Sequence, residues 1–455
     1  MKLLEWDRYQ IRRSVHGGWG GCWMRLGENV VNDKMVPTTS SGLAMSYTEC
    51  DSCRISEEDD LVQVVDIGRQ YLSGVFPRDV SASITKGPLQ LKIGIESGLL
   101  QLGHSYDLNE MYGDTYGYRS GLNDSMVHHL REKRERLCKQ FGMDSPNIAI
   151  DIGSNDGTLL NAYPDDWTRV GVDPSSKKYK EFYKPEIHRY ETFFDDKSAD
   201  EIAGNHGKAD IITSIAMFYD LEKPKEFVSN IRSLLKTDGI WHFEQSYMPA
   251  MLRTNAYDTI CHEHLEYYSL EVVANMLSSE GLKVVDVELN AINGGSFAVT
   301  AARKESKWTP NSPVINWLLR QERAQQLKSP APYRKFEEGI YRHREALRSL
   351  IRDVKEDGKR VCGYGASTKG NTLLQLCGLG AEEIDCIADI NPDKYGCYTP
   401  GTKIPIVSEE QCKELRPDYF LVLPWHFRDG ILKREHEFRK NGGKFIFPLP
   451  EIEII

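Results

Sequence analysis

Residues 146–173 predict a strand, a glycine-containing loop, a short helix and a second strand that ends in an acid. The loop reads Asp151-Ile-Gly-Ser-Asn-Asp-Gly157, and the second strand ends at Asp173. This order of elements is typical of a nucleoside pocket at the edge of a parallel sheet. Gly153 and Gly157 let the backbone pass close to a ligand, because glycine has no side chain to collide with it.

The ligand that suits this pocket is a cationic nucleoside such as S-adenosylmethionine. The spacing differs from the G-x-G-x-x-G dinucleotide fingerprint, and the loop carries acids where a pyrophosphate would need bare amides. We expect the Asp173 carboxylate to accept hydrogen bonds from both ribose hydroxyls and to support little packing. Asp151 and Asn155 complete the predicted cofactor-binding set. An ordinary strand-to-helix turn is the alternative, since glycine and aspartate are common turn residues.

The bulk properties of the chain exclude several classes of partner. A length of 455 residues is too great for one core and predicts two or three domains. The net charge of −10 disfavours nonspecific binding to nucleic acid or anionic lipid. No apolar run approaches a membrane span, and the first residues lack a signal-peptide core, so we expect a cytoplasmic protein. The ten cysteines are scattered, which favours reduced thiols over a disulfide framework.

Four segments follow one another along the chain. Residues 1–45 are rich in glycine and tryptophan and indicate no mechanism, whereas residues 46–104 form a short, turn-rich module. Residues 105–303 and 304–455 each contain a strand that runs into a glycine loop and a helix. We therefore expect an α/β fold: a Rossmann-like domain, a second, C-terminal Rossmann-like domain and a small N-terminal module. The charged helical region at 316–357 is interpreted as solvated surface.

Further strands of the first α/β unit are predicted from short apolar runs at 209–217 and 239–245, which flank a helical segment at 224–236. Residues 283–301 contain two apolar runs around Asn-Gly-Gly-Ser, which predicts a hairpin at the end of this unit. Such an alternation of strands and helices is what a doubly wound sheet requires.

The densest cluster of reactive side chains lies between Tyr257 and Tyr268 and contains Cys-His-Glu-His. Imidazole and carboxylate are zinc and iron ligands, so a metal site is one interpretation. His262 and His264 are only two residues apart, and no third ligand is evident. General acid–base catalysis fits better, because an imidazole takes a proton and an adjacent carboxylate tunes it. A surface His–Glu pair is the remaining alternative.

From about Cys50 to the C-terminus, the chain resembles the nucleotide-sugar C-methyltransferases. The motifs that carry the resemblance are Asp151-Ile-Gly-Ser-Asn-Asp-Gly, Asp258-Thr-Ile-Cys-His-Glu-His-Leu-Glu-Tyr-Tyr-Ser, Asn290-Ala-Ile-Asn-Gly-Gly-Ser, Gly363-Tyr-Gly-Ala-Ser-Thr-Lys-Gly-Asn-Thr, Ala388-Asp-Ile-Asn-Pro-Asp-Lys, Tyr398-Thr-Pro-Gly-Thr and Leu421-Val-Leu-Pro-Trp-His-Phe. One of these motifs alone would be weak, but several in this order are specific. The resemblance implies a zinc-binding N-terminal module, an S-adenosylmethionine-binding Rossmann domain and a C-terminal α/β domain that helps to hold the sugar nucleotide.

The resemblance also implies a reaction. The family methylates a ring carbon, commonly carbon 3 of a 4-keto-deoxyhexose carried on a nucleoside diphosphate. The ketone acidifies the neighbouring C–H, a base removes that proton, and the enolate carbon attacks the sulfonium methyl group. The family's base falls on His264, with Glu263 beside it. Tyr219 stands where related enzymes can carry histidine, and Cys261 where they often carry tyrosine.

Candidate contacts to the sugar nucleotide lie in several of the matching segments. Tyr118 and Arg119 belong to a tyrosine-rich stretch that could line the joint between sugar and cofactor. His262 and Asn293 belong to two of the motifs quoted above, and Tyr364 lies in the C-terminal glycine loop. Lys369 follows that loop at the start of a predicted helix, where amides and an ammonium group suit a diphosphate.

The zinc module departs from the family pattern. Cys50-Asp-Ser-Cys53 supplies one Cys-x-x-Cys pair, which is half of a zinc site. The family pattern would place a second pair at Gly94 and Ser97, and neither residue is a zinc ligand. Cys50 and Cys53 are therefore the only candidate ligands in the pattern, and a bound zinc ion would need further ligands from among Cys22, His16 and His104.

Two other functions remain compatible with these residues. The same scaffold could methylate an oxygen or nitrogen of a related sugar, a reaction that does not need an acidic C–H. A binding protein that kept the folds and lost catalysis is a possibility from a different class. The intact Asp151, Gly153, Asp173 and His264 argue against this second alternative.

Overall fold

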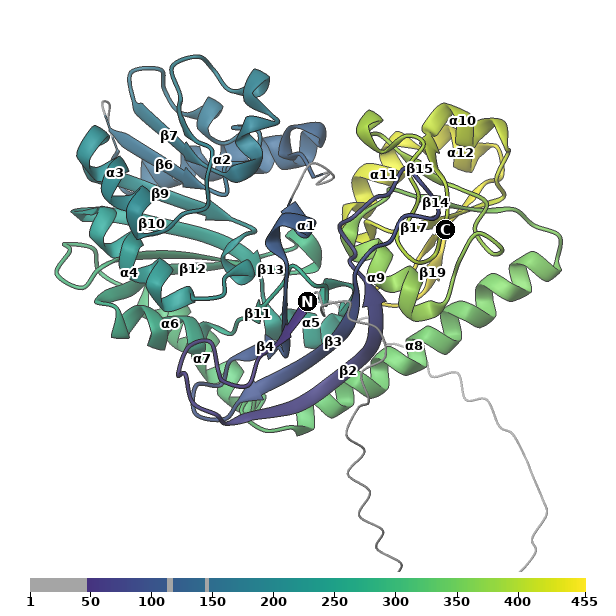
Figure 1. Ribbon diagram of the computed structural model, residues 1–455, viewed down its shortest axis with the longest axis horizontal. Helices are drawn as coiled ribbons and strands as arrows, with labels where there is room; N and C mark the ends of the chain where they lie inside the picture. Colours follow the sequence, from purple (N-terminus) through teal and green to yellow (C-terminus); the bar gives the residue numbers. More distant parts are fainter. Residues whose placement is uncertain (1–46, 113–117, 144–146) are drawn as a thin grey trace, which may run out of the picture. The chain divides into compact units, whose positions relative to one another are not determined.

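The computed structural model describes residues 47–112, 118–143 and 147–455 (Figure 1). The expectation for residues 1–45 lies outside the described residues. Within the described ranges the strands form a seven-stranded, a six-stranded, a four-stranded and a two-stranded sheet. Every helix in these ranges is too short or too polar to traverse a lipid bilayer.

The seven-stranded sheet has the order β12-β13-β10-β9-β6-β7-β8. Its strands are β6 (Ile148–Ile152), β7 (Thr168–Val172), β8 (His188–Tyr190), β9 (Ala209–Ile215), β10 (Leu235–Ser246), β12 (Leu282–Asn290) and β13 (Ser296–Arg303). The five strands from β8 to β10 are parallel, and β13 runs antiparallel to both β10 and β12. The predicted hairpin at 283–301 is the β12–β13 pair, so this expectation is confirmed.

Helices cover both faces of this sheet, because successive strand residues point to opposite sides. On one face, α2 (Asp124–Gln140) packs its apolar residues against Ala149 and Ile211. On the other face, the neighbouring Ile150 and Ile212 belong to the core with the remaining helices. These are α3 (Asp196–His206), α4 (Pro224–Leu234) and α6 (Leu270–Ser279). This arrangement confirms the predicted Rossmann-like α/β fold.

The six-stranded sheet forms a second α/β unit with the order β16-β15-β14-β17-β18-β19. Its strands are β14 (Val361–Tyr364), β15 (Ile387–Asp389), β16 (Ile406–Ser408), β17 (Tyr419–Val422), β18 (Lys444–Phe447) and β19 (Glu453–Ile454). All neighbours are parallel except the β18–β19 pair. Its helices are α9 (Thr368–Cys377), α10 (Glu409–Glu414), α11 (Arg428–Arg434) and α12 (His436–Lys440). The expected second C-terminal α/β unit is thus confirmed.

The small N-terminal module is antiparallel and shares a sheet with a later part of the chain. Its four-stranded sheet consists of β2 (Leu61–Tyr71), β3 (Lys86–Gly94), β4 (Leu100–Leu102) and β11 (Glu266–Tyr267), and β1 (Tyr47–Glu49) pairs separately with β5 (His104–Tyr106). β11 follows the Cys-His-Glu-His segment directly and pairs with β4. This pairing fixes the segment against the N-terminal module.

The long helix α8 (Ala331–Glu356) corrects one expectation. The region 316–357 was interpreted as solvated surface, but one face of α8 is buried. The apolar residues on this face are spaced three, four or seven apart: Tyr333, Phe336, Ile340, Leu347, Ile351 and Val354. The helix contacts β2, β14 and α9, and Figure 1 shows it running alongside β2. The numerous charges occupy only its outer face, so the solvated-surface interpretation of α8 was wrong.

The preceding helix is α7 (Ser312–Ala324), and the shorter helices are α1 (Leu108–Tyr112) and α5 (Met248–Thr254).

Candidate active site

A cavity of about 670 Å³ opens at the carboxyl ends of β6, β7, β9 and β10. This is the edge of a parallel sheet at which nucleotides commonly bind. Six of the predicted site residues line it: Asp151, Gly153, Asn155, Asp173, Tyr118 and Asn293. The local β6–loop–β7 pattern therefore brings the first four of these residues to one cavity.

The loop after β6 passes close to the cavity because of its backbone conformation. Gly153 has φ +76°, and a Cβ there would lie 2.8 Å from the Met217 side chain. Asn155 is also left-handed, with φ +49°, and its Oδ1 accepts from Ser120 N at 3.0 Å. Gly157 packs against the ring of Tyr183 and does not line the cavity. Gly157 thus lies on the side of the loop that faces Tyr183 and not the cavity.

Asp173 has a structural role in addition to its place in the cavity. Its Oδ2 accepts from the Asn155 backbone N at 2.9 Å, and its Oδ1 accepts from Ser175 N and Oγ, each at 2.6 Å. These bonds cap the short helix that begins at Pro174. The expectation that Asp173 supports little packing was wrong, because the carboxylate joins the two loops of the cavity.

Asp151 and Asp173, two of the acids that line the cavity, favour a cationic ligand. Asp151 is buried and accepts from Thr213 Oγ1 at 2.6 Å. Burial and the charge of Asp173 raise the pKa of Asp151 to about 7, against the effect of that hydrogen bond. Burial also raises the pKa of Asp173 above its usual range. Neither carboxylate forms an ion pair with another described residue. A bound cation would stabilise both charged forms, so the residues fit S-adenosylmethionine.

Sequence reasoning missed a buried polar network beside this cavity. Glu244, near the end of β10, lines the cavity. It contacts His129 Nε2 at 2.7 Å and accepts from Lys133 Nζ at 2.7 Å and Asn290 Nδ2 at 2.6 Å. The hydrogen bonds from His129 and Lys133 outweigh burial and lower the pKa of Glu244 to about 2. Two features of the sequence could have indicated this network. One is a glutamate within an apolar strand, and the other is a His–Lys pair spaced four residues apart on one helix.

His264 is held in one tautomer at the edge of a second, small cavity. Its Nδ1 lies 2.8 Å from the Thr259 carbonyl oxygen, which can only accept, so Nδ1 carries the proton. Nε2 is then left with its lone pair. The Tyr219 ring centroid is 4.2 Å from that of His264, and both residues line the small cavity. Burial and the charge of Lys369 lower the pKa of His264 to about 3. The imidazole is therefore a neutral acceptor at neutral pH.

The other two residues of the His-Glu-His stretch point elsewhere. His262 is fully buried, and its ring meets the ring of Tyr106 edge-on with centroids 4.7 Å apart. Glu263 is buried against Gly74, where a Cβ would collide with the carboxylate. Neither side chain lines the two cavities.

Three predicted contacts to the sugar nucleotide remain: Lys369 and Tyr364 in the C-terminal unit, and Arg119 in the first α/β unit. Lys369, in the first turn of α9, donates from Nζ to the Asn293 carbonyl oxygen at 2.9 Å. Tyr364 donates to Glu435 Oε1 at 3.0 Å and also contacts Arg434, so its hydroxyl is occupied within the C-terminal unit. Arg119 lies above the Phe182 ring, with its guanidinium carbon 4.1 Å from the centroid. Of these three residues, Lys369 links the C-terminal unit to a residue that lines the large cavity.

The geometry of the N-terminal module can be compared with the ligand set that a structural zinc site needs. Ser97 Oγ lies 3.1 Å from Cys53 Sγ, and a Cβ on Gly94 would lie 3.0 Å from the same sulfur. Gly94 and Ser97 thus lie beside Cys53, but they offer no thiolate or imidazole. Gln101 Nε2 donates to Cys50 Sγ at 3.3 Å. Hydrogen bonds occupy both thiols, so the residues present do not fit a four-ligand zinc site.

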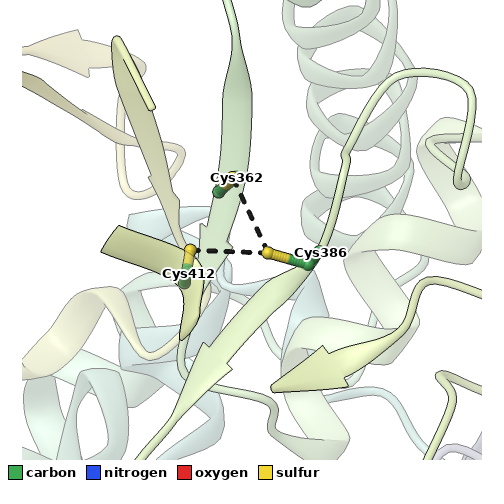
Figure 2. A group of neighbouring side chains, drawn as sticks. All are labelled: Cys362, Cys386 and Cys412. Carbon is green, nitrogen blue, oxygen red and sulfur yellow. Dashed lines mark hydrogen bonds between the residues drawn. The ribbon is translucent and has the colours of Figure 1, made fainter. Parts of the chain in front are cut away.

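A second group of cysteines lies in the core of the C-terminal unit (Figure 2). Cys386 Sγ is 3.4 Å from Cys412 Sγ and 3.8 Å from Cys362 Sγ, and all three residues are buried. They come from β14, the residue before β15, and α10. Structural zinc sites take four ligands, and no fourth His, Cys, Asp or Glu joins this group among the described residues.

We therefore expect the purified protein to contain well under one equivalent of zinc, and a chelator to leave its melting temperature almost unchanged. Metal analysis and thermal unfolding with and without chelator measure this. Stoichiometric zinc that is lost in Cys50→Ser would contradict the prediction for the N-terminal module. Zinc lost in Cys386→Ser, with Cys50→Ser unaffected, would place the metal in the C-terminal cysteine group.

Comparisons with known proteins agree with this architecture. A methyltransferase domain model matches residues 126–287, a C-methyltransferase C-terminal domain model matches 291–450, and a model described as "putative zinc binding domain" matches 53–112. The C-methyltransferase NovU of Streptomyces niveus is 34% identical over 408 residues, which cover 89% of this chain and 97% of that protein.

Solved structures show more distant similarity. An S-adenosylmethionine-dependent methyltransferase from Clostridium acetobutylicum is 12% identical with a TM-score of 0.30, and the match covers 39% of this chain and 92% of that one. Magnesium protoporphyrin IX methyltransferase from Synechocystis is 15% identical with a TM-score of 0.30, and the match covers 42% of this chain and 90% of that one.

Proposed function

Because this chain belongs to the S-adenosylmethionine-dependent C-methyltransferases, we propose that it methylates a ring carbon of a nucleoside-diphosphate 4-keto-deoxysugar, at carbon 3. The single observation that supports this proposal most is the tautomer of His264, which the Thr259 carbonyl fixes with Nε2 free to accept a proton. An imidazole held in this way is suited to remove a proton from the carbon next to a ketone.

The large cavity would hold the methyl donor through this chain's own acids. Asp173 is the proposed ribose ligand, and Asp151 the carboxylate that favours the cation. Asn155 and Gly153 shape the loop over which the nucleoside would lie. When bound, S-adenosylmethionine supplies an electrophilic methyl group on its sulfonium.

In the proposed reaction, His264 Nε2 takes the proton from carbon 3 of the sugar. The C–H electron pair moves toward the ketone and gives an enolate. That pair then forms the new carbon–carbon bond while the carbon–sulfur bond breaks with its pair on sulfur, and the ketone is restored. His264 finally releases the proton to solvent. The carbonyl of Thr259 keeps the ring oriented through both proton transfers.

The function is tested by incubating the protein with radiolabelled S-adenosylmethionine and a panel of dTDP-, GDP- and CDP-4-keto-deoxysugars. We expect label in one sugar nucleotide, on a ring carbon by NMR, and deuterium exchange at carbon 3 in heavy water without the methyl donor. Label on an oxygen or nitrogen, with no exchange at carbon 3, would favour the O- or N-methyltransferase alternative. Donor binding without transfer to any sugar would favour a non-catalytic protein.

Asp173→Asn is expected to weaken S-adenosylmethionine binding by about 2 to 3 kcal/mol, because charge-assisted hydrogen bonds to the ribose are lost. Asparagine keeps an oxygen for the backbone N of Ser175, so the local cap survives better than in an alanine variant. Calorimetry measures the affinity, and circular dichroism checks the fold. An unchanged affinity in the folded variant would rule out Asp173 as the ribose ligand.

A further inference from the structure

Lys369 joins the C-terminal unit to the edge of the large cavity. It lies in the first turn of α9, whose N-terminus is capped by Ser367 Oγ accepting from Gly370 N at 3.0 Å. Its Nζ donates to the carbonyl oxygen of Asn293, and Asn293 itself lines the cavity. The ammonium group is therefore held in place near the proposed methyl donor.

The same end of α9 lies against the segment that contains the proposed base. Thr372 Oγ1 donates to the Ile260 carbonyl oxygen at 3.2 Å. A Cβ on Gly74 would contact Glu263 and lie 3.6 Å from Thr368 Oγ1, so the neighbours of His264 and Lys369 meet at one glycine. The segments that carry Lys369 and His264 are thus adjacent, and the two side chains interact electrostatically.

The charge of Lys369 is only weakly balanced. Among the described residues it forms no ion pair, and its hydrogen-bond partner is a neutral carbonyl. The acid whose charge acts on Lys369 is Asp258, which accepts from Trp425 Nε1 at 2.8 Å. Burial raises the pKa of Asp258 above its usual range, and the charge of Lys369 opposes this shift. The other titratable groups that interact electrostatically with Lys369 are Cys261, His264 and His426. A partly buried cation in such surroundings favours an anionic ligand.

Lys369 could contact either the diphosphate or the ketone oxygen of the sugar, and the positions of these groups on the ring decide between them. The diphosphate is attached to carbon 1, across the ring from carbon 4, whereas the ketone oxygen is on carbon 4, next to the carbon that loses its proton. A group that lies beside the base is therefore nearer to the ketone than to the diphosphate. The diphosphate role expected for Lys369 from its sequence motif does not use this proximity.

We propose that the Lys369 ammonium donates a hydrogen bond to the ketone oxygen of the sugar and stabilises the enolate that forms when His264 removes the proton. This inference rests on the proposed function. As His264 takes the proton, the C–H pair becomes the new C=C bond and the C=O π pair moves onto oxygen, where the cation faces it. When the C=O bond re-forms, the C=C pair becomes the new C–C bond and the methyl–sulfur pair stays on sulfur, so no charge remains on the sugar and Lys369 keeps its proton throughout.

Such a cation also compensates for the weak basicity of the imidazole. Burial and the charge of Lys369 together lower the pKa of His264, which makes the ring a poorer proton acceptor. The same charge at the ketone oxygen makes carbon 3 more acidic, because the enolate gains more from it than the neutral ketone does.

The test is the rate of hydrogen–deuterium exchange at carbon 3 under saturating sugar nucleotide without methyl donor, measured in Lys369→Met and Lys369→Arg. We expect exchange to fall about 10²- to 10³-fold in Lys369→Met, with partial recovery in Lys369→Arg. The dissociation constant of the sugar nucleotide should change by less than about tenfold. Lys433→Met, which removes an exposed ammonium from the same unit, is the matched control and should exchange as the wild type does.

Two outcomes would overturn the inference. If Lys369→Met exchanges at the wild-type rate at saturation but binds the sugar nucleotide much more weakly, Lys369 contacts the diphosphate and not the ketone. Wild-type exchange and wild-type binding together would leave it no role toward the substrate. If the wild-type protein catalyses no hydrogen–deuterium exchange at carbon 3 of any 4-keto sugar nucleotide, the proposed function itself is wrong. This result differs from the two outcomes above, which concern Lys369 alone.

Discussion

His264→Asn is expected to lower turnover by about 10²- to 10⁴-fold, the usual contribution of a positioned general base. Asparagine can still donate to the Thr259 carbonyl, which accepts from the imidazole in the wild type. It has no basic nitrogen to accept a proton, so deuterium exchange at carbon 3 should be lost as well. Steady-state kinetics and NMR exchange measure these effects, and calorimetry should show that both substrates still bind.

His262→Asn is the matched control for this experiment, because it changes the same residue type two positions away. His262 is fully buried against Tyr106 and lines neither cavity. We expect a lower melting temperature in this variant, with exchange at carbon 3 retained in the folded protein. Exchange that persists in His264→Asn and disappears in His262→Asn would reassign the base to His262.

The pH dependence of exchange gives a second check on the base. The folded pKa of His264 is lowered to about 3 in the free protein. A lowered value means that the ring is neutral, and able to accept a proton, at all pH values above this range. The second-order rate constant for exchange reports the ionisation state of the enzyme before the sugar binds. This rate constant should therefore not decline between pH 8 and pH 5 through protonation of His264. A decline with a midpoint near 6.5, the unperturbed value for histidine, would contradict this environment.

Local patterns of the sequence were sufficient to predict the part of the site that is built from consecutive residues. The loop from Asp151 to Gly157 and the acid at Asp173 lie within one strand–loop–helix–strand unit, whose geometry depends on near neighbours. The structure places Asp151, Gly153 and Asp173 at one cavity as that unit requires. The parallel order of the sheet and the β12–β13 hairpin follow from the same local signals.

The features that could not be predicted depend on residues far apart in the chain. Glu244 is contacted by His129, Lys133 and Asn290, which come from a helix and from the end of another strand. The contact of Lys369 with Asn293 joins two α/β units and likewise has no local signal. The error at α8 has a different cause, because its buried apolar period was present in the sequence but was outweighed by its many charges.

Lys133→Met is expected to destabilise the protein by about 3 to 5 kcal/mol, the usual cost of leaving a buried charge without its partner. Lys133 and Glu244 are both almost completely buried, and Nζ lies 2.7 Å from Oε2. Methionine fills a similar volume without the ammonium group, so the loss is electrostatic. Denaturant unfolding measures the effect, and Lys236→Met is the control. Its exposed pair with Asp210, also at 2.7 Å, should contribute no more than about 1 kcal/mol.

The same network predicts how stability changes in acid. The folded pKa of Glu244 is lowered to about 2, whereas an unfolded glutamate titrates near 4.3. Because the folded value is the lower one, the stabilisation is complete above the unfolded pKa and is lost as the pH falls from about 5 toward 2. In Lys133→Met the folded pKa should rise, so the loss of stability over this pH range should be smaller than in the wild type. An equally steep acid loss in both proteins would show that Lys133 does not hold Glu244 in its charged form.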